Sequence, residues 1–207
     1  VHYASVSERW AGVAVAGPRS RELLAAIVDE PALDDAAFPF MAVAEGRIGD
    51  TVCRVARISF SGERAFEVYV PAGYAADLYE RLMTAGEKFG VVPYGLEAMG
   101  TMRIEKGHVA GPELDGRTTP ADLGLGRMQS RKKPHVGAAL RDRDGLLDAD
   151  RPVLVGLKPV DTKTRLRAGA HLVAEGEAAT QEHDAGHVTS IAFSPTIGST
   201  IALGFLA

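Results

Sequence analysis

The sequence predicts an α+β fold that is followed by a small, purely β domain. Apolar strand-like runs alternate with amphipathic stretches in the first half of the chain, which is typical of helices and strands packed in two layers. Residues 111–150 are rich in proline and charge and indicate a connector. Beyond Arg151, short apolar runs are separated by turn residues, as in a small β-barrel or sandwich. We expect a first domain over residues 1–112, a connector over residues 113–150 and a β-barrel domain over residues 151–207.

The strands of the first half are predicted from apolar runs and from alternation. Their expected bounds are residues 11–16, 41–48, 52–60 and 65–70. A Gly49-Asp50 turn joins the second and third of these into a β-hairpin. In the fourth, Phe66, Val68 and Val70 point to one face, whereas Glu67 points to the other.

Two helices are expected to pack on these strands. The first covers residues 20–28, after a Gly17-Pro18 break that is typical of a helix start. The second begins after Gly73, carries one apolar face and ends at Gly90, because glycine readily adopts the left-handed conformation that closes a helix.

A third helix is expected over residues 96–106, and Gly100 inside it predicts close packing against another backbone. A short helix is expected near residues 121–127 of the connector. The four strands of the C-terminal domain are expected at residues 153–157, 170–173, 187–193 and 200–206.

Composition excludes several classes of protein. The 207 residues are 46% hydrophobic and 24% charged, which indicates a folded globular chain, and the net charge of −4 argues against nucleic-acid binding. The longest apolar run, residues 11–17, is too short to span a membrane. The single cysteine, Cys53, excludes an internal disulfide and predicts a reducing, cytoplasmic location. The chain begins at Val1, so we expect a piece of a longer protein.

Most candidate sites have a simple structural interpretation. His183 and His187 have the spacing of a metal-binding helix, but turn residues separate them, so no metal site is expected. The basic run at residues 131–133 could hold an anion, although an exposed linker is the favoured interpretation. Cys53 is expected to be a small apolar residue inside a strand.

Glu67 is the most informative polar residue of the chain. It lies mid-strand between Phe66 and Val68. Its carboxylate either faces water or is buried with hydrogen-bond partners. If buried, it could accept a pair of N–H groups from a heterocycle such as a pterin, whereas spacing alone favours the solvent-facing alternative.

Four motifs carry a resemblance to a known family. Residues 57–67 read Arg-Ile-Ser-Phe-Ser-Gly-Glu-Arg-Ala-Phe-Glu, and the other motifs cover residues 94–107, 115–120 and 186–198. They resemble motifs of the folate-dependent aminomethyltransferase family, whose best-known member belongs to the glycine cleavage system. The resemblance covers essentially the whole chain. It implies a folate-binding aminomethyltransferase-type α+β domain that lacks its N-terminal part, followed by a C-terminal β-barrel domain.

The resemblance also implies roles for individual residues. In the family, the glutamate at the position of Glu67 holds the pterin amide edge of tetrahydrofolate. Phe60 stands where many members have tyrosine, which keeps ring stacking but loses a phenol hydrogen bond. Met99 stands where the glycine-cleavage enzyme has a folate-contacting arginine. Arg103 and Glu105 are expected to brace their helix. No catalytic residue is expected, because the family's catalytic aspartate lies upstream of this chain.

Within the family, the chain is most similar to one branch, the C-terminal half of the α subunit of heterotetrameric sarcosine oxidase. The motifs concerned are residues 16–20, 58–63, 103–108 and 155–161. This resemblance implies a β subunit and further subunits as partners. It implies FMN, FAD and NAD only for the whole complex, and tetrahydrofolate for this chain.

The implied function is oxidative demethylation of sarcosine to glycine, with transfer of the one-carbon unit to tetrahydrofolate. The chain alone is expected to be inactive, and to self-associate through an exposed strand edge and apolar surface. The alternatives are a free-standing aminomethyltransferase, a dimethylglycine-type demethylase, or a non-catalytic module that docks a partner subunit.

Overall fold

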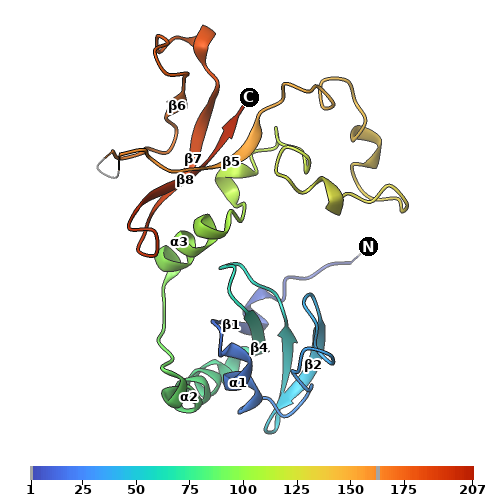
Figure 1. The fold of residues 1–207 in the computed structure, drawn as a ribbon. Coiled ribbons are helices and arrows are strands. Elements are labelled where there is room, and N and C mark those ends of the chain that lie inside the picture. Colours follow the sequence, from blue (N-terminus) through green and yellow to red (C-terminus); the bar gives the residue numbers. More distant parts are fainter. Residues whose placement is uncertain (1, 162–163) are drawn as a thin grey trace. The chain divides into compact units, whose positions relative to one another are not determined.

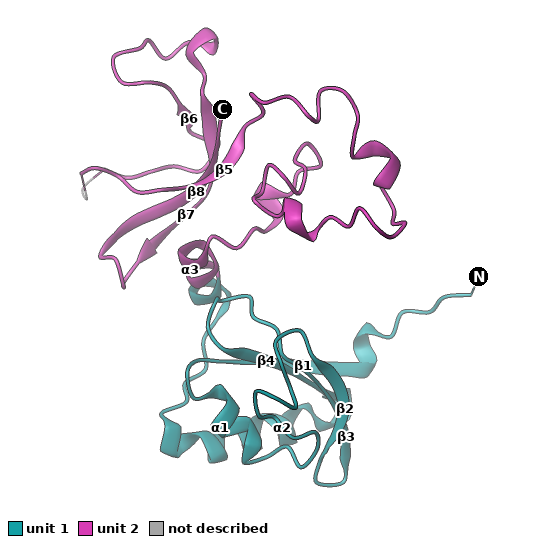
Figure 2. Cartoon of the chain, turned by 45° about the vertical axis from the view of Figure 1, so that its right-hand side comes forward, with its two compact units in different colours: residues 1–99 teal, residues 100–207 magenta. Residues whose placement is uncertain are grey.

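The chain forms two compact units, Val1–Met99 and Gly100–Ala207 (Figures 1 and 2). The structure is a computed structural model that describes residues 2–161 and 164–207. Each unit holds a four-stranded antiparallel sheet of its own, so each has its own core. No helix of the described residues is long and apolar enough to cross a membrane.

The first unit is a sheet with helices on one face (Figure 1). Its strands are β1 (Trp10–Ala16), β2 (Val43–Ile48), β3 (Thr51–Ala56) and β4 (Ala65–Pro71), in the order β1-β4-β3-β2. Its helices are α1 (Ser20–Ala25) and α2 (Ala75–Gly86), with short 3-10 turns at Ser7–Arg9, Ala72–Tyr74 and Glu87–Phe89. Helix α3 (Leu96–Lys106) begins in the last residues of the first unit.

The core of this unit lies between the sheet and the helices. Phe66, Val68 and Val70 of β4 are buried and pack with Leu24 of α1 and Leu78 of α2. Because strand side chains alternate, the residues between them face the other side of the sheet. The predicted alternation of β4 is confirmed, and this alternation leaves Glu67 on the face opposite the helices.

The second unit carries a curled, barrel-like sheet. Its strands are β5 (Val153–Leu157), β6 (His171–Leu172), β7 (Gly186–Ser194) and β8 (Ser199–Leu206), in the order β5-β8-β7-β6. Its 3-10 turns are Gly111–Glu113, Gly126–Met128, Ala138–Leu140 and Gln181–His183. Ile104 of α3 packs with Ile201 and Leu203 of β8 in a small core. The predicted α+β class with a barrel-like C-terminal domain is therefore confirmed.

Several predicted elements are shorter than expected. The hairpin strand expected to reach residue 60 ends at Ala56. Arg57 still exchanges backbone hydrogen bonds with Met41 and Ala42, but Met41 has a φ of +71°, which lies outside strand geometry, so the pairing stops there. The first helix ends at Ala25 and not at residue 28. In place of a helix over residues 121–127 there are turns, since Gly124 has a φ of +72° that breaks helical geometry.

One expectation about packing is wrong. A Cβ built on Gly100 would meet no atom within 4 Å, so this glycine is not required by a neighbouring backbone. The bounds of its helix are as predicted, and Gly107 ends it with a φ of +73°.

Candidate functional site

Glu67 stands in the middle of the first unit's sheet, on the face without helices. Its cross-strand neighbours are Ala14 of β1 and Ala56 of β3. The side chain of Glu67 is half-buried, and Ala14 is exposed. Of these two small neighbours, Ala14 is exposed and Ala56 is buried, so a flat ligand could reach the carboxylate from the β1 side of the sheet.

Tyr69 holds the Glu67 carboxylate. The two residues are two positions apart on β4, so they share a face of the sheet. The Tyr69 hydroxyl donates a hydrogen bond to Glu67 Oε2. This hydrogen bond, together with burial and the negative charge of Glu67, raises the pKa of Tyr69 to about 12. The phenol therefore keeps its proton at neutral pH and acts as a donor to the carboxylate.

The position of the Tyr69 ring depends on Gly12. Gly12 of β1 lies directly opposite Tyr69 in the register. A Cβ on Gly12 would come within 2.7 Å of Tyr69 Cε1 and 2.8 Å of Cδ1. The ring thus lies over the bare backbone of β1, in space that any larger residue would occupy.

The next residues on this face carry charge. Arg54 of β3 is the other cross-strand neighbour of Tyr69. Its guanidinium lies 4.2 Å from the centre of the Trp10 ring and binds Glu45 Oε1 at 3.1 Å. Arg54 is therefore held by a cation–π contact and an ion pair.

The other two residues that the resemblance assigns to folate lie on different elements. Phe60 is in the loop between β3 and β4, and 36% of it is exposed. Met99 is a half-buried residue of α3. Glu67, Phe60 and Met99 thus come from a strand, a loop and a helix, and their joint role in one pocket stays a prediction.

A depression of about 420 Å³ lies elsewhere in the first unit, along α2. Its lining residues are mainly polar: Ile27, Asp77, Glu80, Arg81, Thr84 and Ala85. Asp77 and Arg81 form an exposed ion pair in it at 2.8 Å. None of the residues with predicted site roles lines this depression.

A buried carboxylate organises the second unit, and the sequence reasoning missed it. Glu113 is fully buried and accepts hydrogen bonds from Ser190 Oγ and Thr189 Oγ1, each at 2.6 Å, and from the Ala110 N–H and Arg103 Nη1, each at 2.9 Å. Burial raises the pKa of Glu113, but the hydrogen bonds and the charge of Arg103 lower it by more than burial raises it. The net shift of its pKa is therefore downward. All four donors belong to this unit, and together they hold the buried carboxylate in place.

The predicted bracing of α3 is confirmed. Arg103 Nη2 donates to Ser190 Oγ at 2.7 Å, and Glu105 accepts a hydrogen bond from the Ser194 hydroxyl. Both serines lie on β7, so the helix is fixed to the C-terminal sheet.

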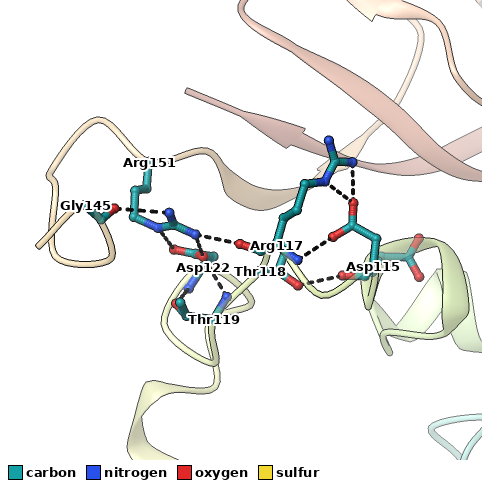
Figure 3. Close-up of polar contacts among 8 residues, drawn as sticks. Asp115, Arg117, Thr118, Thr119, Asp122, Gly145 and Arg151 are labelled. Atoms are coloured by element: carbon teal, nitrogen blue, oxygen red, sulfur yellow. Dashed lines mark hydrogen bonds and ion pairs between the residues drawn. The ribbon is translucent and has the colours of Figure 1, made fainter. Parts of the chain in front are cut away.

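A second carboxylate, that of Asp122, binds Arg151 and so connects the two ends of the long connector of this unit (Figure 3). Asp122 accepts from Arg151 Nε at 3.1 Å, from Arg151 Nη2 at 2.5 Å and from the Thr119 N–H at 2.7 Å. Arg151 also donates to the carbonyls of Arg117 and Gly145. One guanidinium therefore joins the two ends of the segment between residues 122 and 151.

The remaining candidates have the surroundings of structural residues. Cys53 is completely buried in β3, and burial raises its pKa, which makes it a poor nucleophile. The basic run at residues 131–133 is exposed. His183 lies in a 3-10 turn and His187 in β7. Among the described residues, no group of three or more His, Cys, Asp or Glu side chains is placed to hold a metal ion.

Comparison with protein families matches both units. The GCVT N-terminal domain matches residues 1–133, and the glycine cleavage T-protein C-terminal barrel domain matches residues 153–207. The first match alone covers more than half of the chain.

Similar proteins fall into two groups. The chain is 49% identical to sarcosine oxidase subunit alpha of Rhizobium meliloti (strain 1021), over 100% of this chain and 21% of that protein. It is 35% identical to an aminomethyltransferase of Streptomyces coelicolor, over 96% of this chain and 52% of that protein. The chain thus spans about a fifth of the length of the former and about half of the latter.

A solved structure has a similar fold. The aminomethyltransferase T of the glycine cleavage system from Bartonella henselae matches with a TM-score of 0.69 and 28% identity, over 95% of this chain and 51% of that one. Two family matches in the expected order and this shared fold lead to one conclusion. The chain belongs to the GCVT family, the family of the glycine cleavage T-protein.

Proposed function

We propose that this chain is the folate-binding C-terminal region of a sarcosine oxidase α-like subunit. The whole complex would demethylate sarcosine oxidatively to glycine and transfer the one-carbon unit to tetrahydrofolate. The 49% identity to a sarcosine oxidase subunit alpha along the full chain supports this branch of the family. The partners of the chain would be the β subunit and the other subunits of a heterotetramer.

The observation that carries the folate-binding role is the environment of Glu67. A half-buried carboxylate stands between two alanines on a sheet face without helices. Carboxylates make charge-assisted hydrogen bonds to N–H donors, and these bonds are shorter and stronger than neutral ones. The pterin of tetrahydrofolate offers a flat ring and an N–H edge, so the residues present fit this ligand.

In this proposal the chain binds and orients, and does no proton transfer. Glu67 is an acceptor for the pterin, while Phe60 and Met99 supply apolar contacts at the rim. When bound, tetrahydrofolate supplies the nitrogen atoms that accept the one-carbon unit. Holding the acceptor close to the source of that unit makes the transfer effectively unimolecular. FMN, FAD and NAD are assigned to the rest of the complex, and we place the complex in the cytoplasm.

The experiment compares Glu67→Gln with the unchanged protein in the full-length subunit and its complex. Tetrahydrofolate binding is measured by titration calorimetry, and the variant should bind about 1–3 kcal/mol more weakly, since a charged acceptor becomes a neutral one. Oxidase turnover without folate should stay the same. Glu63→Gln, an exposed glutamate in the turn before β4, is the matched control and should bind normally. Unaltered affinity in Glu67→Gln would refute the role.

A free-standing aminomethyltransferase is the second candidate. The 35% identity to the Streptomyces coelicolor aminomethyltransferase favours it. Purification of the natural full-length protein separates the two candidates: a bound flavoprotein partner supports the oxidase, and a single chain without flavin supports the aminomethyltransferase. A third candidate, a module that only docks a partner subunit, predicts no saturable folate binding by the full-length protein.

A further inference from the structure

We infer that Tyr69 is a positioning residue for Glu67: it occupies one carboxylate oxygen and thereby fixes the other toward a ligand on the sheet face. Gly12 takes part by leaving room for the Tyr69 ring. This inference rests on the proposed folate-binding role of Glu67 and assigns a second residue to the same site.

The first step is the hydrogen bond between the two side chains. Tyr69 and Glu67 share a face of β4, and the Tyr69 hydroxyl donates to Glu67 Oε2. Among the described residues, this is the one side-chain hydrogen bond that Glu67 makes, so Oε1 has no donor there. A half-exposed glutamate without such a contact samples several rotamers, and binding has to fix them at a cost in conformational entropy. Tyr69 fixes the carboxylate before a ligand arrives.

The second step concerns the kind of ligand that the pair selects. At neutral pH the phenol keeps its proton, because the pKa of Tyr69 is raised to about 12. That proton is already donated to Glu67. The pair therefore offers acceptors only: Oε1 of the carboxylate and the lone pairs of the phenol oxygen. A ligand edge with two neighbouring N–H donors matches this pair, whereas an edge that presents an acceptor does not.

The third step is the contribution of Gly12. Its backbone lies opposite Tyr69 in the register, and a Cβ there would come within 2.7 Å of the ring. Any side chain at this position would push the ring away and move the hydroxyl off the carboxylate. Since the ring is the end of a half-exposed side chain, it can move without disrupting the core. Gly12→Ala should therefore change the site and leave the fold intact.

The test uses the full-length protein and 5-formyltetrahydrofolate, a stable reduced folate, in calorimetric titrations. Tyr69→Phe removes the hydroxyl and keeps the ring, and should raise the dissociation constant about five- to tenfold, as expected for one lost hydrogen bond. Gly12→Ala should raise it to a similar extent. Tyr79→Phe is the matched control, because Tyr79 is an exposed tyrosine of α2, and it should bind like the unchanged protein.

A double-mutant cycle separates positioning from a general structural effect. If Tyr69 acts through Glu67, Tyr69→Phe should weaken binding little in a Glu67→Gln background. Thermal unfolding of each variant shows whether a loss of affinity comes from a loss of fold. Equal losses from Tyr69→Phe in both backgrounds, or a Tyr69→Phe variant that binds normally while Glu67→Gln does not, would overturn the inference.

A spectroscopic measurement tests the contact without any ligand. With ¹³Cζ-labelled tyrosine, the resonance that disappears in Tyr69→Phe belongs to Tyr69. It should shift in Glu67→Gln and in Gly12→Ala, while the Tyr79 resonance stays in place. If the unchanged protein binds no folate, the proposed function fails, and this comparison still decides whether Tyr69 holds Glu67. An unmoved Tyr69 resonance in Glu67→Gln rejects the positioning role.

Discussion

Glu113 and Ser190 lie 77 positions apart in the sequence, yet the Ser190 hydroxyl donates to the buried Glu113 carboxylate at 2.6 Å. Arg103 completes the group, since it binds both residues. The carboxylate therefore fixes α3 and the turn after it to β7. Networks of this kind stabilise a fold only when every buried polar group has a partner.

Removing the charge of Glu113 should destabilise the second unit strongly. Glu113→Gln leaves the Arg103 guanidinium, which is largely buried, without a counter-charge, and breaking a buried pair costs about 3–5 kcal/mol. Urea unfolding should show that the free energy of unfolding falls by this amount. Glu182→Gln changes an exposed glutamate of the same unit and should stay within about 0.5 kcal/mol of the unchanged protein. A Glu113→Gln protein as stable as this control would contradict the role of the network.

Stability should fall on acidification. The pKa values of Glu113 and Asp122 are both lowered in the folded chain; burial opposes this shift, and hydrogen bonds and the facing arginines outweigh burial. A carboxyl whose pKa is lower in the folded state stabilises the fold above its unfolded pKa, and this stabilisation is lost as pH falls from that value through the folded one. We therefore expect the free energy of unfolding to decrease from about pH 5 downward, starting near the ordinary carboxyl pKa values. Urea unfolding between pH 7 and pH 3 measures this slope, and Glu113→Gln should flatten it.

Removing the paired hydrogen bonds between Arg151 and Asp122 should make the connector more flexible. Arg151→Lys keeps the charge but cannot make two parallel hydrogen bonds to the carboxylate or reach the carbonyls of Arg117 and Gly145. We expect faster tryptic cleavage at residues 131–133 and a loss of about 1–3 kcal/mol of stability. Arg143→Lys, at an exposed position of the same segment, is the control. Identical cleavage rates in Arg151→Lys and Arg143→Lys would contradict the role of Arg151 in holding the connector.

A side chain at Gly186 should destabilise the second unit. Its φ is +145°, and a Cβ there would lie 1.9 Å from the carbonyl oxygen of Phe205. Because the obstacle is backbone of the paired strand β8, Gly186→Ala must shift the sheet and should lower the melting temperature by several degrees, corresponding to at least about 1–2 kcal/mol. Gly156→Ala, in β5 with no atom within 4 Å of its Cβ, should have a small effect.

The isolated chain should self-associate. Strand β1 is an edge of its sheet, and edge strands offer unpaired N–H and C=O groups to other chains. Strand β2 is the opposite edge, and Val43 of β2 and Val52 of the adjoining β3 are exposed, at 69% and 46%. Sedimentation velocity at micromolar concentration should give dimers or larger species, and a sharp monomer peak would disprove the expectation.

The local sequence pattern was sufficient to predict features that depend on a single helix or strand. The alternation of β4 predicted its buried face, because strand side chains alternate regardless of their neighbours. The bounds of α3 and its end at Gly107 followed from helical pattern and from the left-handed preference of glycine. The helix expected near residue 121 failed because two glycines, Gly124 and Gly126, lie inside it and favour turns.

Residue order and short-range periodicity were enough to predict the family, the α+β class and the face of the sheet on which Glu67 lies. The groups that surround each carboxylate became known from the three-dimensional packing. The register of β1, β4 and β3 places Gly12, Ala14 and Ala56 beside Tyr69 and Glu67, and β7 brings Thr189 and Ser190 to Glu113. Strand register and long-range hydrogen bonds are set by packing between distant segments, and no local pattern of residues encodes them.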